Sequence, residues 1–200
     1  MSKQTIISIG REFGSGGHVI AELLSKSLGL PLYDRNILSE IEKEKGNSYE
    51  AYHAYDEKAP NPFLTRSVHG QTNSVEKIVA ELQFDFLRQK AKDGESFIVL
   101  GRCAEEVLRG TKGLISIFLL ADRDAKVKRV MEKFDLDENE AIAKMKRHDR
   151  KRKNYHNTYA SGKWGDSRTY DLCINTSRLG LEKSAEELVN YIRFRMEHDT

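Results

Sequence analysis

Short apolar runs alternate with longer amphipathic segments along most of the chain. Five runs are nearly continuous in hydrophobicity and cover residues 6–9, 30–33, 96–100, 114–120 and 170–176. Such runs are typical of strands that are buried on both faces of a sheet. Between them, apolar residues recur at helical spacing over residues 19–28, 36–45, 75–93, 104–108, 122–134, 137–155 and 180–196. The alternation predicts an α/β fold whose parallel sheet is covered by helices on both faces.

Polar residues stand at the ends of four of these predicted strands. They are Gly10-Arg11, Asp34-Arg35, Gly101-Arg102 and Asn175-Thr176-Ser177. Ligands of parallel α/β sheets bind at the carboxyl ends of the strands. We therefore expect these residues to gather along one edge of the molecule.

The periodic pattern is lost between Asn47 and Asn73, where polar and aromatic residues dominate. A connection of this length is usually a functional loop or a mobile flap. Elsewhere the chain shows no repeat, low-complexity tract or linker, and its 200 residues suit one α/β domain. We expect a single domain over residues 1–200.

Composition narrows the classes of function. Charged residues make up 32% of the chain, but the net charge of +2 gives little reason to expect nucleic-acid binding. No apolar run approaches the ~18 residues of a membrane span, and the N-terminus lacks a signal-peptide pattern. Two isolated cysteines, Cys103 and Cys173, lie in or beside predicted buried strands. They favour a reducing cytoplasm over a disulfide framework or a zinc site.

A glycine cluster separates the first predicted strand from the first predicted helix. Gly14, Gly16 and Gly17 allow backbone N–H groups to converge in front of a helix N-terminus, which suits a phosphate. A phosphate loop normally ends in Lys followed by Ser or Thr, whereas this chain has Gly17-His18-Val19. A dinucleotide site would need a third spaced glycine, although Asp34 lies about 20 residues further on. A purely structural turn is the third interpretation, and the phosphate loop is favoured.

Cationic residues suggest where further phosphate contacts could arise. Arg102 and Arg35 could bind a phosphate through the planar guanidinium, or lie on the surface. The basic run 144–153 fits a lid over transferring phosphates, a solvated helix face or a nucleic-acid patch. Trp164, between glycines, could wedge the base of such a lid against the sheet or cover a ligand.

Taken together, four groups of residues resemble the cytidylate kinase-like family, a branch of the nucleoside monophosphate kinases among P-loop proteins. These groups are Arg11-Glu12-Phe13-Gly14-Ser15-Gly16-Gly17, Tyr33-Asp34-Arg35, Gly101-Arg102-Cys103-Ala104, and Lys163-Trp164-Gly165-Asp166 with 170–177. The resemblance runs from about Thr5 to Tyr191. It implies a three-layer P-loop NTPase fold with a central five-stranded parallel sheet. It also implies an acceptor-binding arm over about 35–92 and a helical lid over about 137–168.

The resemblance also implies roles for individual positions. Residues expected to bind ATP or its phosphates are Arg11, Gly14, Ser15, Gly16, Gly17, His18 and Arg129. Residues expected to contact the acceptor are Asp34, Arg35 and Arg102. Arginines of the lid, which such kinases place on phosphates, correspond to Arg147, Arg150 and Arg152.

Three positions depart from the family pattern. Gly17 replaces the phosphate-loop lysine, Val19 replaces the hydroxyl residue that holds magnesium, and Cys103 replaces an aspartate. Catalysis would need another cation, and the candidates are Arg11, Arg147, Arg150, Arg152 and Lys163. Magnesium could still be held indirectly, through water, by Ser15 and the nucleotide phosphates.

The expected activity is transfer of the terminal phosphoryl of ATP, with Mg²⁺, to a nucleoside monophosphate, most simply CMP or dCMP. One alternative is a nucleotide-binding regulatory or sensor protein that transfers no phosphate. Another is a kinase of a different small acceptor. The expected partners are small-molecule nucleotides and not membranes or nucleic acid. The oligomeric state is left open, with a homodimer as one option.

Overall fold

A five-stranded parallel sheet forms the centre of the molecule in this computed structural model, which describes residues 4–46, 48–60, 67–68, 71–72 and 74–198. Its strands are β1 (Ile6–Arg11), β2 (Leu32–Tyr33), β5 (Phe97–Leu100), β6 (Leu114–Leu120) and β7 (Leu172–Asn175). They lie in the order β2-β5-β1-β6-β7, with Ile7 of β1 opposite Ile98 and Ile115. The continuous apolar runs thus form a buried parallel sheet, as predicted.

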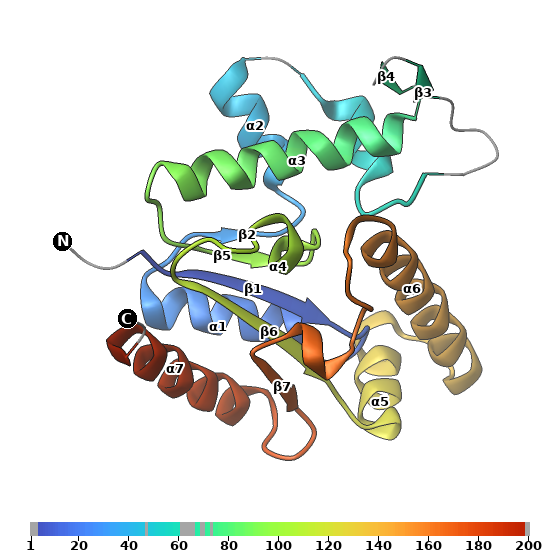
Figure 1. Cartoon of the computed structure of the whole chain (residues 1–200). Coiled ribbons are helices and arrows are strands. Elements are labelled where there is room, and N and C mark those ends of the chain that lie inside the picture. The colour runs from blue at the N-terminus through green and yellow to red at the C-terminus, as the bar shows by residue number, and fades with distance from the viewer. Residues whose placement is uncertain (1–3, 47, 61–66, 69–70, 73, 199–200) are drawn as a thin grey trace.

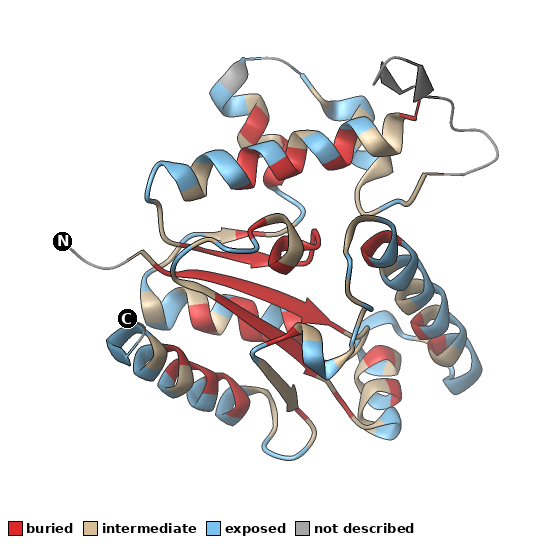
Figure 2. Ribbon diagram, in the orientation of Figure 1, coloured by how far each residue is buried: buried red, intermediate tan, exposed pale blue. Residues whose placement is uncertain are grey.

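Helices cover both faces of the sheet and make a three-layer molecule (Figure 1). On one face lie α1 (Gly17–Leu28) and α7 (Leu181–His198), which pack on Ile7, Ile9 and Ile117. On the other lie α2 (Ile37–Lys45), α3 (Val75–Lys92) and α4 (Ala104–Val107), which pack on Ile6, Phe97 and Val99. Successive β1 residues supply opposite faces because side chains alternate along a strand. Figure 2 shows the resulting burial along the strands.

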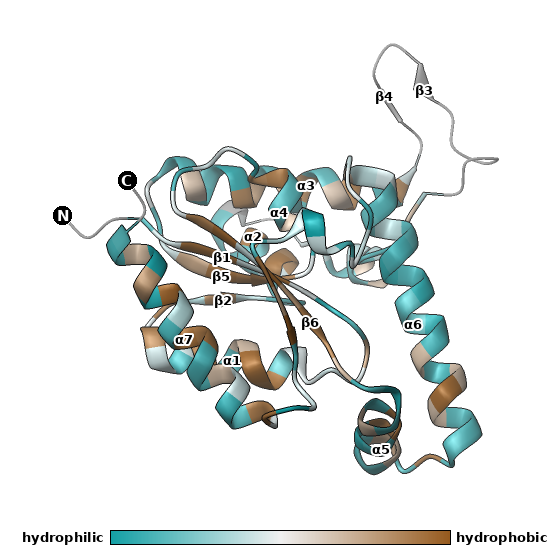
Figure 3. Cartoon of the chain, turned by 60° about the horizontal axis from the view of Figure 1, so that its bottom comes forward, coloured by the Kyte–Doolittle hydropathy of each residue, from teal (hydrophilic) through white to brown (hydrophobic). Residues whose placement is uncertain are grey.

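Two further helices, α5 (Arg123–Phe134) and α6 (Glu138–Tyr159), stand at the carboxyl ends of the strands (Figure 1). They pack together through Val127, Val130, Ala141 and Met145. The rest of α6 is strongly hydrophilic, as its colour in Figure 3 shows. A capping box at Asp137 and Glu140 starts α6. The helix extends four residues beyond the predicted end at Tyr155, because Tyr155 and Tyr159 pack near Phe84 of α3.

The irregular segment expected between Asn47 and Asn73 contains short regular elements. A 3₁₀ helix, η1 (Glu50–Tyr55), precedes an antiparallel pair made of β3 (Ser67–Val68) and β4 (Gln71–Thr72). Tyr49, Tyr52 and Tyr55 pack against the cluster that joins α2 and α3 to the sheet. The aromatic residues therefore anchor η1 by tertiary contacts that no helical periodicity reveals.

The end of the chain also refines two predictions. A second 3₁₀ helix, η2 (Ser167–Thr169), precedes β7, so Tyr170 lies just before that strand. Trp164 packs edge-on against Phe118 of β6, with ring centroids 5.4 Å apart. This contact favours the wedge interpretation of the tryptophan.

Cys103 is buried and Cys173 only half-buried, and both are free thiols. Within the described residues, no helix is long and apolar enough to cross a membrane.

Candidate functional site

The turn between β1 and α1 has a backbone shape that its glycines permit. Gly14 and Gly16 adopt left-handed conformations, with φ of 84° and 85°. A Cβ on Gly16 would collide with the side chain of Leu181. No side chain caps the N-terminus of α1. The N–H groups of its first turn are therefore available to an anion.

Ser15 fixes the turn instead of presenting its hydroxyl. The residue is fully buried, and Oγ donates to the carbonyl of Glu12 at 2.9 Å. Its own carbonyl accepts a hydrogen bond from Thr176 Oγ1 at 2.8 Å. Arg129 reinforces the same contact by donating to the carbonyl of Gly14 at 3.2 Å and to Thr176 Oγ1 at 3.1 Å. Arg129 therefore supports the turn from α5, and burial lowers its pKa.

A cavity of about 400 Å³ opens in front of this turn. Its wall combines the turn with the end of β2, the N-terminus of α1 and the facing sides of α5 and α6. Five basic residues line it, namely Arg11, Arg35, Arg129, Lys133 and Arg152. Glu12 and Asp34 are the acidic residues of the lining. The cavity is within the size range of small-molecule sites, and its lining favours an anionic ligand.

Arg11 passes across the position where a phosphate loop would carry its lysine. A Cβ on Gly17 would lie 2.9 Å from Arg11 Cγ, so the glycine makes room for the arginine. The guanidinium then reaches Glu57, with hydrogen bonds of 3.0 and 3.4 Å to its two oxygens. A Cβ on Gly101 would also collide with this guanidinium. Two glycines thus form the channel that Arg11 occupies.

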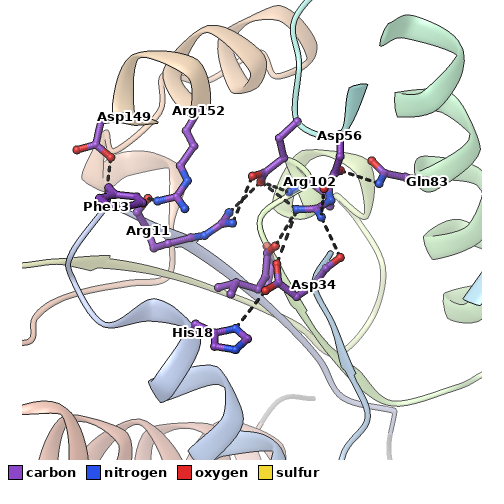
Figure 4. A network of polar contacts seen from close by, with 12 residues as sticks. Arg11, Phe13, His18, Asp34, Asp56, Gln83, Arg102, Asp149 and Arg152 are labelled. Atoms are coloured by element: carbon purple, nitrogen blue, oxygen red, sulfur yellow. Dashed lines mark hydrogen bonds and ion pairs between the residues drawn. The ribbon is translucent and has the colours of Figure 1, made fainter. Parts of the chain in front are cut away.

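Arg152 brings a second cation to the turn from α6 (Figure 4). It donates to the carbonyl of Arg11 at 3.4 Å, and its guanidinium lies 5.6 Å from the ring centroid of Phe13. Burial and the neighbouring charge of Arg11 lower the pKa of Arg152 to about 10. The side chain is therefore still positively charged at neutral pH.

Arg102 lies behind the cavity in a network of carboxylates (Figure 4). It is 1% exposed, and its guanidinium lies 2.7 Å from Asp56, 3.1 Å from Glu57 and 3.9 Å from Asp34. Although burial alone would lower its pKa, Glu57 and Asp56 raise it. Burial has the opposite effect on Glu57, but Arg11 and Arg102 hold the pKa of its carboxyl well below the usual range. The arginines and the carboxylates therefore stabilise one another's charged forms inside the protein.

Asp34 joins this network to the glycine turn. Its backbone carbonyl accepts a hydrogen bond from Arg102 at 2.9 Å, and Oδ2 lies 3.1 Å from His18 Nδ1. Oδ1 is buried and has no hydrogen-bond partner among the described residues. This oxygen lies 3.9 Å from the Arg102 guanidinium, which is its ionic partner.

The predicted residues divide into three groups, of which the first, Ser15 and Arg102, is buried outside the cavity lining. Gly14, Gly16, Gly17, His18, Asp34, Arg35, Arg11, Arg129 and Arg152 line the cavity. Arg147 and Arg150 are exposed, and Arg150 lines a separate hollow with Lys153 and Trp164. Lys163 is exposed beside Asp166 and Arg168, in another hollow. Of the three arginines predicted to lie in a lid, Arg152 reaches the turn.

Asp56 and Glu57 are the site residues that the sequence prediction missed. They directly follow η1, within the segment where no pattern was found. They lie 46 and 45 positions from Arg102 in the chain. Adjacent acidic residues after a run of tyrosines were the only available signal, and it is weak. Only the folding of the arm over β5 brings them to the arginine.

A magnesium ion fits this site only when a nucleotide carries it. The hydroxyl of Ser15 points into the turn, and Val19 offers no ligand atom. The turn itself therefore offers magnesium no direct side-chain ligand.

Known proteins resemble the chain in sequence and in structure. A model of the cytidylate kinase-like family matches residues 6–178. An uncharacterized protein from Eubacterium ventriosum ATCC 27560 is 39% identical, over 95% of this chain and 99% of that one, with a TM-score of 0.75. No match is found among curated proteins.

More distant structures share the fold. A shikimate kinase from Bacteroides thetaiotaomicron is 14% identical, over 94% of this chain and 98% of that one, with a TM-score of 0.55. A shikimate kinase from Acinetobacter baumannii, in complex with shikimate, is 12% identical, over 97% and 96%, with a TM-score of 0.52. At these identities the likeness concerns the P-loop kinase fold alone.

Proposed function

The chain belongs to the cytidylate kinase-like family, and from this premise we propose that it transfers the terminal phosphoryl of ATP to CMP or dCMP. A kinase-type phosphotransferase is the activity that the family supports. The acceptor is our proposal. It rests on the resemblance of Asp34 and Arg102 to the acceptor-binding positions of cytidylate kinases.

One observation carries the proposal: a single cavity joins an uncapped helix N-terminus to basic side chains from β1, α5 and α6. Phosphoryl transfer needs mainly positioning and positive charge around the transferring group. The N–H groups at the start of α1 would bind the β- and γ-phosphates of ATP. Magnesium, when bound with ATP, would neutralise charge on these phosphates.

Arg152 and Arg11 would replace the missing lysine. Arg152 comes from the lid helix and already contacts the backbone of Arg11 beside the turn. The side chain of Arg11 occupies the space that a side chain on residue 17 would need. The preceding residue, Gly16, is one of the predicted phosphate contacts. Both cationic side chains are arginines, whose forked donors suit phosphate oxygens. Asp34, which lines the cavity between His18 and Arg102, would orient the acceptor.

The test compares Arg152→Ala with Arg193→Ala, a control on the exposed side of α7. We measure ADP release from ATP with CMP, dCMP and other nucleoside monophosphates. Loss of a charge that stabilises the transition state costs about 10²–10³ in rate. We expect a fall of this size in kcat for Arg152→Ala and an unchanged kcat for Arg193→Ala. Equal kcat values in both variants would exclude Arg152 as the substitute for lysine.

Calorimetry with ATP separates the kinase from a nucleotide-binding regulator. Wild-type protein that binds ATP but releases ADP with none of the acceptors would contradict the kinase. The departures at Gly17 and Val19 make this second measurement necessary.

A kinase of a different small acceptor is the second candidate, and the environment of Arg102 favours it. Three carboxylates already surround that guanidinium within 3.9 Å, so an acceptor phosphate would have to displace one of them. An acceptor with hydroxyl groups and no phosphate could bind Asp34 without bringing a second anion to Arg102. Adding polyhydroxylated acceptors to the same assay tests this candidate. It requires ADP release with one of these acceptors and no ADP release with CMP.

A further inference from the structure

A buried cluster of three chemically different ligand groups lies behind the candidate site. Cys103 and Glu105, at the start of α4, meet His156, near the end of α6. They are 4%, 7% and 4% exposed, and the Sγ, carboxylate and ring-nitrogen atoms lie within 4.8 Å of one another. The spacing of the two cysteines in the sequence gave no sign of a metal site. The fold creates the cluster by bringing α6 onto α4.

Neighbouring groups orient these side chains toward one another. Asn157 Oδ1 accepts a hydrogen bond from the backbone N–H of Trp164 at 3.0 Å and lies 3.3 Å from His156 Nδ1. Because that oxygen is an acceptor, it favours the tautomer with the proton on Nδ1, while Nε2 lies 2.7 Å from Glu105 Oε1. The other oxygen of Glu105 accepts from Ser8 Oγ at 3.2 Å. Such outer partners are typical of side chains that bind metals.

An unsatisfied hydroxyl beside the cluster is an independent sign of a missing ligand. The hydroxyl of Tyr155 has no hydrogen-bond partner among the described residues, although this residue is only 3% exposed. The nearby hydroxyl of Tyr170, in contrast, bonds the backbone of Gly165. Both tyrosines line a narrow cavity of about 20 Å³ together with the three cluster residues. A cavity of this volume holds one water-sized occupant, and buried polar atoms normally have a partner.

We propose that Cys103 Sγ, Glu105 and His156 Nε2 bind one zinc ion. Thiolate, imidazole and carboxylate are the ligands that zinc takes in proteins, at bond lengths of about 2.0–2.3 Å. The ion would separate Glu105 from His156 and draw in Cys103, whose thiol proton passes to solvent. The thiolate and the carboxylate balance its two positive charges. A water in the cavity, near the tyrosine hydroxyls, completes four-fold coordination.

This zinc site has a structural consequence for the neighbouring arginines. Cys103 directly follows Arg102, and His156 lies one helical turn after Arg152. A zinc ion would therefore join the base of the lid helix to the loop that carries Arg102. The site does not depend on the proposed kinase activity, because its ligands lie outside the lining of the main cavity.

The competing explanation is a metal-free ion pair between His156 and Glu105. It also leaves the cluster electrically neutral, with the Cys103 thiol hydrogen-bonded to Glu105 and 3.9 Å from the carbonyl of His156. The two explanations differ in metal content and in whether the sulfur is a ligand.

The experiment uses the whole chain, freed of metal by chelation and titrated with Zn²⁺ or with Co²⁺ as a spectroscopic substitute. We expect one ion per chain and, with Co²⁺, a thiolate-to-metal charge-transfer band. Cys173→Ser is the matched control, because it removes the other cysteine and should bind and absorb like wild type. Cys103→Ser should lose the band, and both Cys103→Ser and His156→Gln should bind Zn²⁺ at least ten times more weakly.

Wild-type protein that takes up no ion would overturn the proposal without relying on any variant. A charge-transfer band that survives in Cys103→Ser, or disappears in Cys173→Ser, would also overturn it. Circular dichroism of each metal-free variant shows that the compared chains are folded. A zinc-dependent rise in the melting temperature of wild type, absent in His156→Gln, would support it independently of spectroscopy.

Discussion

Gly17 shows at the scale of a single residue how this site differs from a lysine-bearing phosphate loop. The residue opens α1 and does not need a left-handed backbone, so its conformation suits other amino acids. Its role is steric, because a Cβ there would press on Arg11 near the backbone. The position of Arg11 therefore depends on the absence of a side chain at residue 17.

Gly17→Ala tests this dependence. We expect the variant to fold but to displace Arg11, so that kcat of the phosphotransferase falls about tenfold or more. In an Arg11→Ala background, the same substitution should cause a smaller further loss, because the contact with Cγ is gone and only the contact with Cβ at 3.0 Å remains. Kinetics of the two single variants and the double variant measure this coupling. Additive losses would show that Gly17 acts independently of Arg11.

At the scale of elements, specific contacts hold the helix α6 against the glycine turn. His148 stacks on Phe13, with ring centroids 4.3 Å apart and planes 11° from parallel. The next residue, Asp149, accepts a hydrogen bond from the backbone N–H of Phe13 at 2.7 Å. These contacts place Arg152, one turn further along α6, beside Arg11. The lid helix and the turn therefore share a docking surface whose strength decides where the arginine lies.

Protonation of His148 should weaken this surface. Burial, followed by the charges of Arg152 and Arg147, lowers its pKa from 6.5 to about 4. Between these values the unfolded chain binds the proton and the folded chain does not, so stability falls as the pH drops from 6.5 to 4. Partial exposure reduces the effect to about 1–2 kcal/mol.

His148→Phe retains the stacking and removes the titrating group. Between pH 7 and 4, the free energy of unfolding should decrease in both proteins. We expect the decrease in His148→Phe, measured by urea denaturation, to be smaller than that of wild type by about 1–2 kcal/mol. A variant of the exposed His198, such as His198→Asn, should follow wild type. Identical pH dependence in His148→Phe and wild type would contradict the assignment.

Glu57 connects three parts of the whole molecule. It belongs to the arm, it bonds Arg11 of β1, and it bonds Arg102, which follows β5. The charge of Arg152 on the lid helix also acts on its carboxyl. The carboxylate thus stands among the arginines that an acceptor phosphate would approach. An ion network, and not apolar contacts alone, therefore joins the segment that carries Glu57 to the central sheet.

Glu57→Gln should affect stability and acceptor binding in opposite directions. We expect a loss of about 1–3 kcal/mol in the free energy of unfolding, because Arg102 loses one of its charged partners. Removing the negative charge should lower KM for CMP about tenfold if the acceptor phosphate replaces Glu57. Glu50→Gln, on the exposed side of η1, is the control. An unchanged or higher KM for CMP would instead favour an acceptor without phosphate.

The prediction from sequence succeeded where structure follows from local pattern. The runs at 6–9, 96–100 and 114–120 became the central strands, because a continuous apolar run can be buried only inside a covered sheet. The glycine turn and its helix were also evident, since Gly14 and Gly16 supply conformations that few residues adopt. Strand ends therefore predicted which residues would meet at one edge of the sheet.

Amino-acid sequence alone thus determined the layers, the turn and the family of this protein. Tertiary structure alone decided which charges are free. It paired Arg102 with Asp56 and Glu57, turned Arg152 toward the cavity and Arg150 away from it, and assembled Cys103 with His156. Hydrophobic periodicity is local and repeats along the chain, so it can be read in order. Charge pairing depends on distances between remote segments, which only the folded packing sets.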